Sequence, residues 1–431
     1  MRSVRRALPV LVAASIALAA CTPGPTGSPA PTPGLPTFVP SVAPSAGPSV
    51  PPAQSGAPSA VYEQIRLQVE AIRGLEPTAD VDPVTIDELQ LVQNLEGEID
   101  SDLTPEVLQQ SNDLLHALDL IPQDSSLRDL TLDLLAGQVA GYYSPDRDEL
   151  FVVSRTGQTV GAVERATYAH EFTHQLQDQT FDLDNFDTST ADESDRALAE
   201  TALIEGDATS VQTTWLLQGN LTADELGELI EAAMDPDALA ALNNAPAYLR
   251  ETSLFPYDAG AAFVQELVAE GGYEAVNDAF EHPPASTEQV LHPAKYRDRE
   301  DPVEVKVRDG IAGAVGQGWS EELRDQLGEL ILRIWLSDHG VGAEAASDAA
   351  AGWGGDRLVM LSHEDGSIAI ALATTWDTPG DAAEFAEAAQ TALGDADFAG
   401  GDLFHRAGSR DVLIALGDDA DAAAVLAALR G

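Results

Sequence analysis

The chain has 431 residues, of which 72 are acidic and 22 are Lys or Arg, so its formal net charge is −50. Hydrophobic residues make up 44% of the sequence, which excludes a wholly disordered chain and suffices for packed cores in two or three domains. The negative charge argues against nucleic acid and anionic lipid surfaces as partners, because both repel an acidic protein.

Residues 1–20 have the features of a secretory signal peptide. Three arginines precede an apolar stretch, Ala7 to Ala20, which is shorter than the roughly 20 residues that a membrane-spanning helix needs. The stretch ends in Leu18-Ala19-Ala20-Cys21, at the only cysteine of the chain, and resembles the lipobox, in which the cysteine becomes the lipidated first residue of the mature protein. An ordinary signal peptide is the alternative. We expect an extracytoplasmic protein that is lipid-anchored to the cell membrane at Cys21 and contacts the membrane through this lipid only.

Residues 21–60 are expected to form an extended spacer. From Thr22 to Ala60 there is no charged residue, and this segment holds 12 of the 26 prolines. Such a composition cannot bury enough apolar surface to offset the entropy of ordering. At about 3.1 Å per residue the spacer could extend for roughly 120 Å and hold the rest of the chain away from the membrane.

Residues 61–300 are predicted to form one α+β domain. Apolar residues at helical spacing predict several helices, and two β-favouring runs around a Pro-containing turn predict a β-hairpin. In chain order the expected elements are helix 62–75, helix 105–120, strand 138–143, strand 149–153, helix 160–177 and helix 196–217.

The predicted helix 160–177 contains His170-Glu171-Phe172-Thr173-His174, which matches the H-E-x-x-H motif. Residues four apart lie about one turn apart on the same helix face, so both imidazoles can bind a single ion. Glu171 is rotated by about 100° from His170 and can sit beside the open coordination position of the ion. Imidazole nitrogens beside a carboxylate favour Zn²⁺ over Mg²⁺ or Ca²⁺, which prefer oxygen ligands.

A catalytic zinc site also needs a third protein ligand. The position that supplies it in metzincins, six residues after the second histidine, is Thr180, which excludes that class. Glu205 is the best candidate, because it lies in the next predicted helix beside Gly206 and Ala208, and small residues let two helices approach closely. Glu200 is the alternative. It lies five residues away, about 140° around the helix, so the two carboxylates cannot both face the ion.

The H-E-x-x-H helix, the later helix with Glu205 and the preceding hairpin together resemble the zincin metallopeptidases, specifically the gluzincins, whose third ligand is Glu. The resemblance covers about residues 60–300. It implies a zincin-like catalytic domain in which His170, His174 and Glu205 bind Zn²⁺ and Glu171 is the general base. The segment between His174 and Glu205 is longer than the gap in several gluzincin families, so the subfamily stays open.

The chemistry of these residues predicts the mechanism. Zn²⁺ polarises the peptide carbonyl, and Glu171 takes the proton of the attacking water and passes it to the leaving amine. By the resemblance, strand 149–153 or its partner forms the edge of a cleft where an extended protein or peptide substrate pairs. Gluzincins usually add a downstream His or Tyr that stabilises the oxyanion. His292 is favoured for this catalytic role, with Tyr296 and Tyr257 as alternatives.

Five further acidic residues have a weaker case. Asp178 and Asp207 could orient a ligand imidazole, although a solvated carboxylate is the more common outcome. Asp182, Asp184 and Asp187 could suggest calcium, but their spacing is not that of an EF-hand loop. Zn²⁺ is therefore the cofactor that the sequence predicts.

Residues 301–431 are predicted to form a smaller α+β unit of unknown role. Ser320 is a fair N-cap, Gly340 a good helix stop and Asp365-Gly366 a hairpin signal. Residues 352–356, Gly-Trp-Gly-Gly-Asp, lack the Lys-Ser/Thr ending of a phosphate loop and are predicted to form a turn. The expected elements are helix 320–339, strand 357–361, strand 367–374, helix 382–393, strand 411–416 and helix 420–429.

The sequence thus predicts a lipid-anchored extracytoplasmic zinc metallopeptidase. A second hypothesis is a zinc amidase that acts on cell-wall peptides. A third is a non-catalytic surface-binding lipoprotein that holds the metal only structurally or has lost its activity. Intact Glu171 argues against the third, because a closed structural zinc site would fill the fourth coordination position with another His or Cys.

Overall fold

The computed structural model describes residues 58–79, 82–102, 104–136, 139–153, 160–186, 193–394 and 400–431. The predicted signal peptide, the predicted lipidation site Cys21, almost all of the predicted spacer and Asp187 lie outside these ranges. Within the described ranges, no helix combines the length and the apolar character that crossing a membrane requires.

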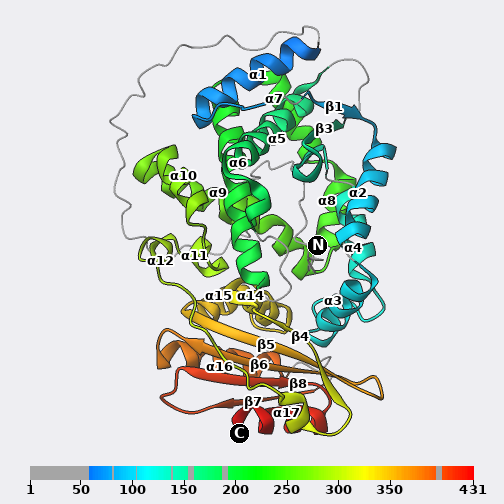
Figure 1. The fold of residues 1–431 in the computed structure, drawn as a ribbon, viewed down its shortest axis with the longest axis vertical. Helices are drawn as coiled ribbons and strands as arrows, with labels where there is room; N and C mark the ends of the chain where they lie inside the picture. Colours follow the sequence, from blue (N-terminus) through cyan, green and yellow to red (C-terminus); the bar gives the residue numbers. More distant parts are fainter. Residues whose placement is uncertain are drawn as a thin grey trace, which may run out of the picture.

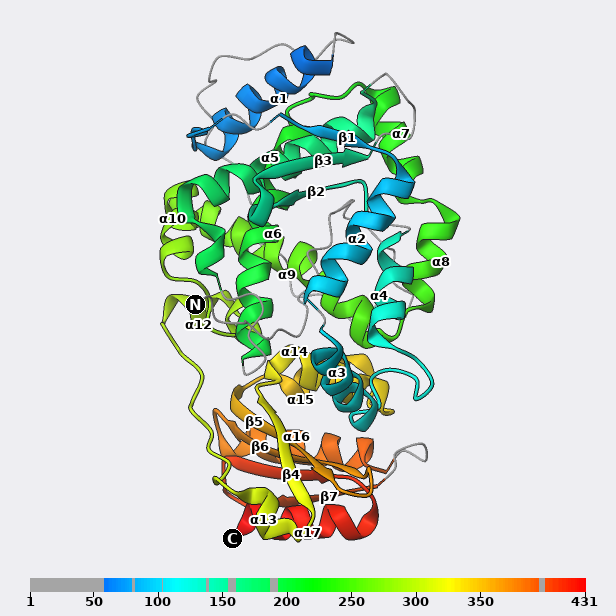
Figure 2. The same cartoon turned by 45° about the vertical axis from the view of Figure 1, so that its right-hand side comes forward.

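The protein is an α+β protein, as predicted, with two small sheets at opposite ends. In Figures 1 and 2 a mainly helical part carries the first sheet, and the second sheet lies at the other end with the C-terminus beside it. The helical part begins with a helix, a short strand and three more helices: α1 (Pro58–Arg73), β1 (Val84–Ile86), α2 (Glu88–Asp102), α3 (Pro105–Ala117) and α4 (Leu127–Ala136).

The first sheet contains the predicted β-hairpin. Strands β2 (Gly141–Ser144) and β3 (Glu149–Val153) pair antiparallel, and β1 pairs parallel with β3. The turn between β2 and β3 ends at Asp148, whose φ of 52° lies in the left-handed region that Asp tolerates. Because β3 lies in the middle of the order β1-β3-β2, it cannot be a cleft edge, and its partner β2 is an edge strand.

Three long helices form the centre of the helical part: α5 (Ala162–Phe181), α6 (Ser194–Leu217) and α9 (Ala247–Gly271). Nearly every residue of α5 from Ala162 to Gln177 is buried, on all sides of the helix. Its apolar side chains share one core cluster with residues of α1, the first sheet and α6. Because other elements surround α5 on all sides, it has no clear amphipathic pattern. For the same reason its polar residues are buried too.

Helices α6 and α9 touch at their backbones. A Cβ atom on Gly206 would lie 2.3 Å from the carbonyl of Gly260, and one on Gly260 would lie 2.2 Å from the carbonyl oxygen of Ala202. Only glycine fits at these two positions. We expected Gly206 to let α6 approach the H-E-x-x-H helix; it lies against α9 instead.

Shorter helices surround these three and lead to the second sheet. They are α7 (Ala223–Ala233), α8 (Pro236–Asn244), α10 (Tyr273–Glu281), α11 (Thr287–Leu291), α12 (Pro293–Arg297) and α13 (Ile311–Val315).

The second sheet has five antiparallel strands in the order β4-β5-β6-β8-β7. Alternate residues of β6 face opposite sides. Ala369, Ala371 and Ala373 belong to the core with α13 and α17, whereas Ile370 and Leu372 belong to the core with α14 and α16. The elements of this unit are β4 (Trp319–Asp325), α14 (Gly328–Asp338), α15 (Ala343–Ala350), β5 (Trp353–His363), β6 (Ile368–Trp376), α16 (Pro379–Ala392), β7 (Gly401–His405), β8 (Asp411–Leu416) and α17 (Asp419–Arg430).

Two expectations for the second unit are wrong. The predicted helix 320–339 is a strand in its first part, because β4 pairs with β5; the helix begins only at Gly328, where φ is 75°. Ser320 is therefore no helix cap. The predicted turn 352–356 is confined to Gly352, and Trp353 already begins β5, which carries a bulge before Gly355.

Candidate metal centre

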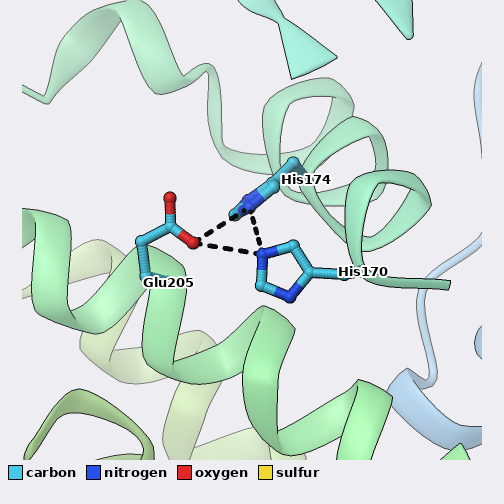
Figure 3. Close-up of side chains that lie close together, drawn as sticks. All are labelled: His170, His174 and Glu205. Carbon is cyan, nitrogen blue, oxygen red and sulfur yellow. Dashed lines mark hydrogen bonds and ion pairs between the residues drawn. The ribbon is translucent and has the colours of Figure 1, made fainter. Parts of the chain in front are cut away.

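Three side chains from two helices converge in the middle of the helical part. His170 and His174 come from α5, and Glu205 comes from α6 (Figure 3). The two Nε2 atoms are 3.0 Å apart, and Glu205 Oε2 lies 3.1 Å from His170 Nε2 and 3.3 Å from His174 Nε2. All three side chains are buried, with at most 6% of each residue exposed.

The donor triangle fits a tetrahedral zinc ion. Zinc bonds of about 2.0–2.1 Å put neighbouring ligand atoms of a tetrahedron about 3.3–3.4 Å apart. The observed separations of 3.0 to 3.3 Å are close to this value. Two imidazole nitrogens and one carboxylate oxygen are also the donor set that zinc takes in catalytic sites. Another group that could hold an ion, Asp278, Glu281 and His282, is exposed on the surface.

The electrostatics of the cluster favour a positive charge at its centre. Burial by itself lowers the pKa of His174, but the Glu205 carboxylate outweighs this effect and raises that pKa to about 9. Burial likewise raises the pKa of Glu205, but the imidazoles of His174 and His170 lower it to about 2. A site that stabilises a protonated imidazole beside a carboxylate also stabilises a bound cation.

Glu171 lies beside the three candidate ligands and does not belong to their group. It is 1% exposed, and burial raises the pKa of its carboxyl group, while the imidazoles of His170 and His174 oppose this rise. The backbone N–H of Tyr143 in the edge strand β2 donates a hydrogen bond to the carboxylate. Among the described residues no group hydrogen-bonds its Oε1 atom, so one oxygen is available to a reacting molecule.

Glu200, the alternative third ligand, faces elsewhere. Arg196 Nε donates a hydrogen bond of 2.8 Å to Glu200 Oε1, and Glu200 is not part of the ligand triangle. This separation follows from the rotation of about 140° that five residues make around a helix. Asp182 and Asp184, named for calcium, do not belong to either potential ion-binding group of the described residues.

The candidates for oxyanion stabilisation lie in different places. The ring of Tyr257, on α9, has its centroid 6.3 Å from that of His170, so it borders the site. The imidazole of His292 lies between α11 and α12, and its Nε2 is 2.9 Å from Glu329 Oε1 on α14. The hydroxyl of Tyr296 donates to the carbonyl of His282. The structure thus places Tyr257 beside His170, whereas the Nε2 atom of His292 and the hydroxyl of Tyr296 contact other groups.

Neither aspartate suggested for orienting an imidazole contacts one. Asp178 accepts hydrogen bonds from the Tyr143 hydroxyl, at 2.9 Å, and from the backbone N–H of Leu183. Asp207 instead contacts Gln177, and Gln177 contacts His174. No functional role was predicted for Gln177; its spacing of three residues from His174, which puts both on one helix face, was the available signal.

Comparison with known proteins covers only the C-terminal unit. The model of a family described as a domain of unknown function (DUF8575) matches residues 317–427, which hold the whole second sheet but none of the metal-centre residues. No match was found among the curated proteins or among the solved structures.

Proposed function

We propose that the protein is a zinc-dependent metallopeptidase of the gluzincin type. The observation that carries this proposal is the convergence of His170, His174 and Glu205 on one buried point. The three come from two helices, and their donor atoms have the spacing of a tetrahedral zinc site. Three protein ligands leave a fourth position open, as catalytic zinc requires.

Glu171 is the general base of the proposed reaction. When bound, Zn²⁺ would polarise a peptide carbonyl and make a water molecule more acidic. Glu171 then accepts the proton of the attacking water at Oε1, the oxygen that no described group occupies, and returns it to the leaving amine. The Tyr143 N–H holds the carboxylate in place from β2. Of the three candidates for stabilising the oxyanion, Tyr257 is the one whose ring borders that of His170.

The proposed substrate is a protein or peptide outside the cytoplasm. The lipobox at Cys21 and the apolar segment before it support an extracytoplasmic protein anchored by lipid. The net charge of −50 disfavours nucleic acid and favours basic or neutral substrates over acidic ones.

Metal analysis and hydrolysis assays on the wild type and Glu171→Ala test the function. We expect about one zinc ion per chain in both, since Glu171 is not a ligand. We expect casein hydrolysis to fall by about 10²- to 10⁴-fold in the variant, the usual contribution of a general base. Equal hydrolysis by the two proteins, or a wild type without zinc, would contradict the proposal. Cleavage of muropeptides but not of proteins would support the cell-wall amidase instead.

A further inference from the structure

A chain of buried contacts leads from the metal centre to the end of α1. His174 Nδ1 lies 2.9 Å from Gln177 Oε1, and Gln177 Nε2 donates to Asp207 Oδ2 at 2.9 Å. Asp207 Oδ2 in turn accepts from Arg73 Nε at 2.8 Å. Gln177, Asp207 and Arg73 are all 0% exposed. Four side chains from α5, α6 and α1 thus form one continuous path.

The amide of Gln177 can adopt only one orientation in this path. Its Nε2 atom has two hydrogens, and both are used, one on Asp207 Oδ2 and one on the carbonyl of Ile204 at 3.0 Å. A flipped amide would put its oxygen against two acceptors. The atom that faces His174 is therefore the oxygen Oε1, which can only accept a hydrogen bond. In the neutral imidazole, the form that binds a metal, the hydrogen of His174 must then sit on Nδ1, which leaves the lone pair of Nε2 directed at the ligand triangle.

Arg73 supplies the positive charge that balances the buried carboxylate of Asp207. Its guanidinium is always positive and pairs with the buried Asp207 carboxylate. Its Nη1 atom donates to Asn277 Oδ1 at 2.7 Å, and the aromatic ring of Tyr273 lies 5.0 Å from the guanidinium carbon. The arginine is thus held on several sides and fixes Asp207 as an acceptor for Gln177.

We infer that Gln177 and Asp207 are positioning residues for His174. They fix its tautomer and ring orientation for metal binding, and Arg73 connects this device to α1, the first described helix after the predicted spacer. The inference rests on the proposed zinc site. The competing explanation is that these hydrogen bonds merely satisfy buried polar groups, and this explanation predicts a loss of stability without a specific loss of zinc.

The test is the zinc affinity of Gln177→Met, measured by competition with a chelator. Met has a similar volume but offers His174 no amide oxygen. We expect zinc binding to weaken by about 10- to 100-fold, as is typical for removal of an outer partner of a metal ligand. Gln175→Met is the matched control, because Gln175 is equally buried on the same helix but donates to the carbonyl of Ala79 instead. The control should bind zinc as tightly as the wild type.

Circular dichroism and thermal unfolding of the metal-free proteins separate a positioning role from a structural one. Wild-type zinc affinity in Gln177→Met, or equal losses in Gln177→Met and Gln175→Met, would overturn the inference. If Gln177→Met does not fold, Gln177→Asn takes its place, since its amide is one methylene too short to bridge His174 and Asp207; the same loss is expected. A wild type that binds zinc but cleaves no peptide would contradict the proposed function and leave this inference standing, whereas a wild type without zinc would contradict both.

Discussion

Buried carboxylates in two regions of this protein are stabilised in opposite forms, charged in one and neutral in the other. The first region is the candidate metal centre, with Glu205. The other, which we call the junction cluster, consists of Asp195 at the start of α6, Asp325 at the end of β4 and Asp356 in β5, each 1% exposed. The junction cluster lies where the helical part meets the second sheet. For all four carboxylates, burial disfavours the charged form because the group is removed from water.

The pKa values show the difference. The imidazoles of His174 and His170 outweigh burial and lower the pKa of Glu205 to about 2. In the junction cluster burial dominates and raises the pKa of Asp325 to about 7 and that of Asp356 to about 6. The hydrogen-bond donors around Asp325 are the amide and hydroxyl of Ser194 and an adjacent backbone amide. These donors lower the pKa of Asp325, but burial outweighs them, whereas at Glu205 the imidazoles outweigh burial.

Among the variants that test this comparison, Glu205→Gln is expected to have the largest effect. The change removes the negative charge that faces the imidazoles while keeping the shape of the side chain. We expect zinc binding to weaken by more than the roughly 10- to 100-fold typical of outer partners, and peptide hydrolysis to disappear with it. Metal analysis and a casein assay measure both.

Glu200→Gln is the matched control for this variant. Glu200 is buried on the same helix, with 2% exposed, but pairs with Arg196. It should retain zinc and activity. If Glu200→Gln loses zinc and Glu205→Gln keeps it, the third ligand has been assigned to the wrong residue.

A second variant, Arg73→Met, sharpens the comparison by leaving a further buried carboxylate, that of Asp207, without its positive partner. Asp207 is paired with Arg73, and both side chains are fully buried. Removing one partner of such a pair typically costs about 3–5 kcal/mol, because the remaining charge is left buried and unpaired. Urea unfolding measures this loss. Arg128→Met, which breaks a more exposed pair with Asp100, should change the free energy of unfolding far less, and equal losses in the two variants would contradict the account.

The sequence predicted the cluster of His170, His174 and Glu205 where its geometry is local. His170 and His174 are four residues apart, so helix periodicity alone places them on one face. Glu205 followed from the need for a third ligand in the next helix. Arg73 and Gly260 could not be predicted, because their partners Asp207 and Ala202 lie in helices far away along the chain, and a contact of this kind is set by tertiary packing.

The C-terminal unit shows how tertiary pairing overrides local preference. Residues 320–326 include Glu321, Glu322, Leu323 and Arg324, which favour a helix by propensity. They form β4 because β5 offers a long strand for pairing and Gly328 permits the positive φ at which α14 begins. Strand β8, an apolar run bounded by turn residues, was predicted with its observed bounds, 411–416. A pattern closed within one element, such as that of β8, was therefore predicted well, whereas the edge strand β4, which depends on pairing with β5, was not.

A smaller effect is expected from Gly260→Ala, which tests whether the metal centre depends on the close contact of α6 and α9. The added Cβ would lie 2.2 Å from the carbonyl oxygen of Ala202, so the helices must separate. We expect a loss of about 1–3 kcal/mol, as for overpacked cores, together with weaker zinc binding because Glu205 moves with α6. Gly227→Ala in α7 has no atom within 4 Å of the added methyl and should stabilise the protein by up to about 1 kcal/mol. Unchanged zinc binding in a destabilised Gly260→Ala would show that the ligand geometry tolerates a shift of α6.

The pH dependence of Asp325→Asn tests the junction cluster itself. The folded protein raises the pKa of Asp325 from 3.8 to about 7, so between these values the folded state holds a proton that the unfolded state has lost. The free energy of unfolding therefore falls as the pH rises through this window, by at most about 1.4 kcal/mol per pH unit for one proton. Asparagine keeps the shape and does not titrate, so the stability of the variant should fall less steeply when urea unfolding is compared at pH 4.5, 5.5 and 6.5. Parallel curves for the two proteins would mean that Asp325 is charged in the folded protein. The hydrogen-bond donors around Asp325 would then outweigh burial, as the imidazoles do at Glu205, and the contrast between the two regions would be lost.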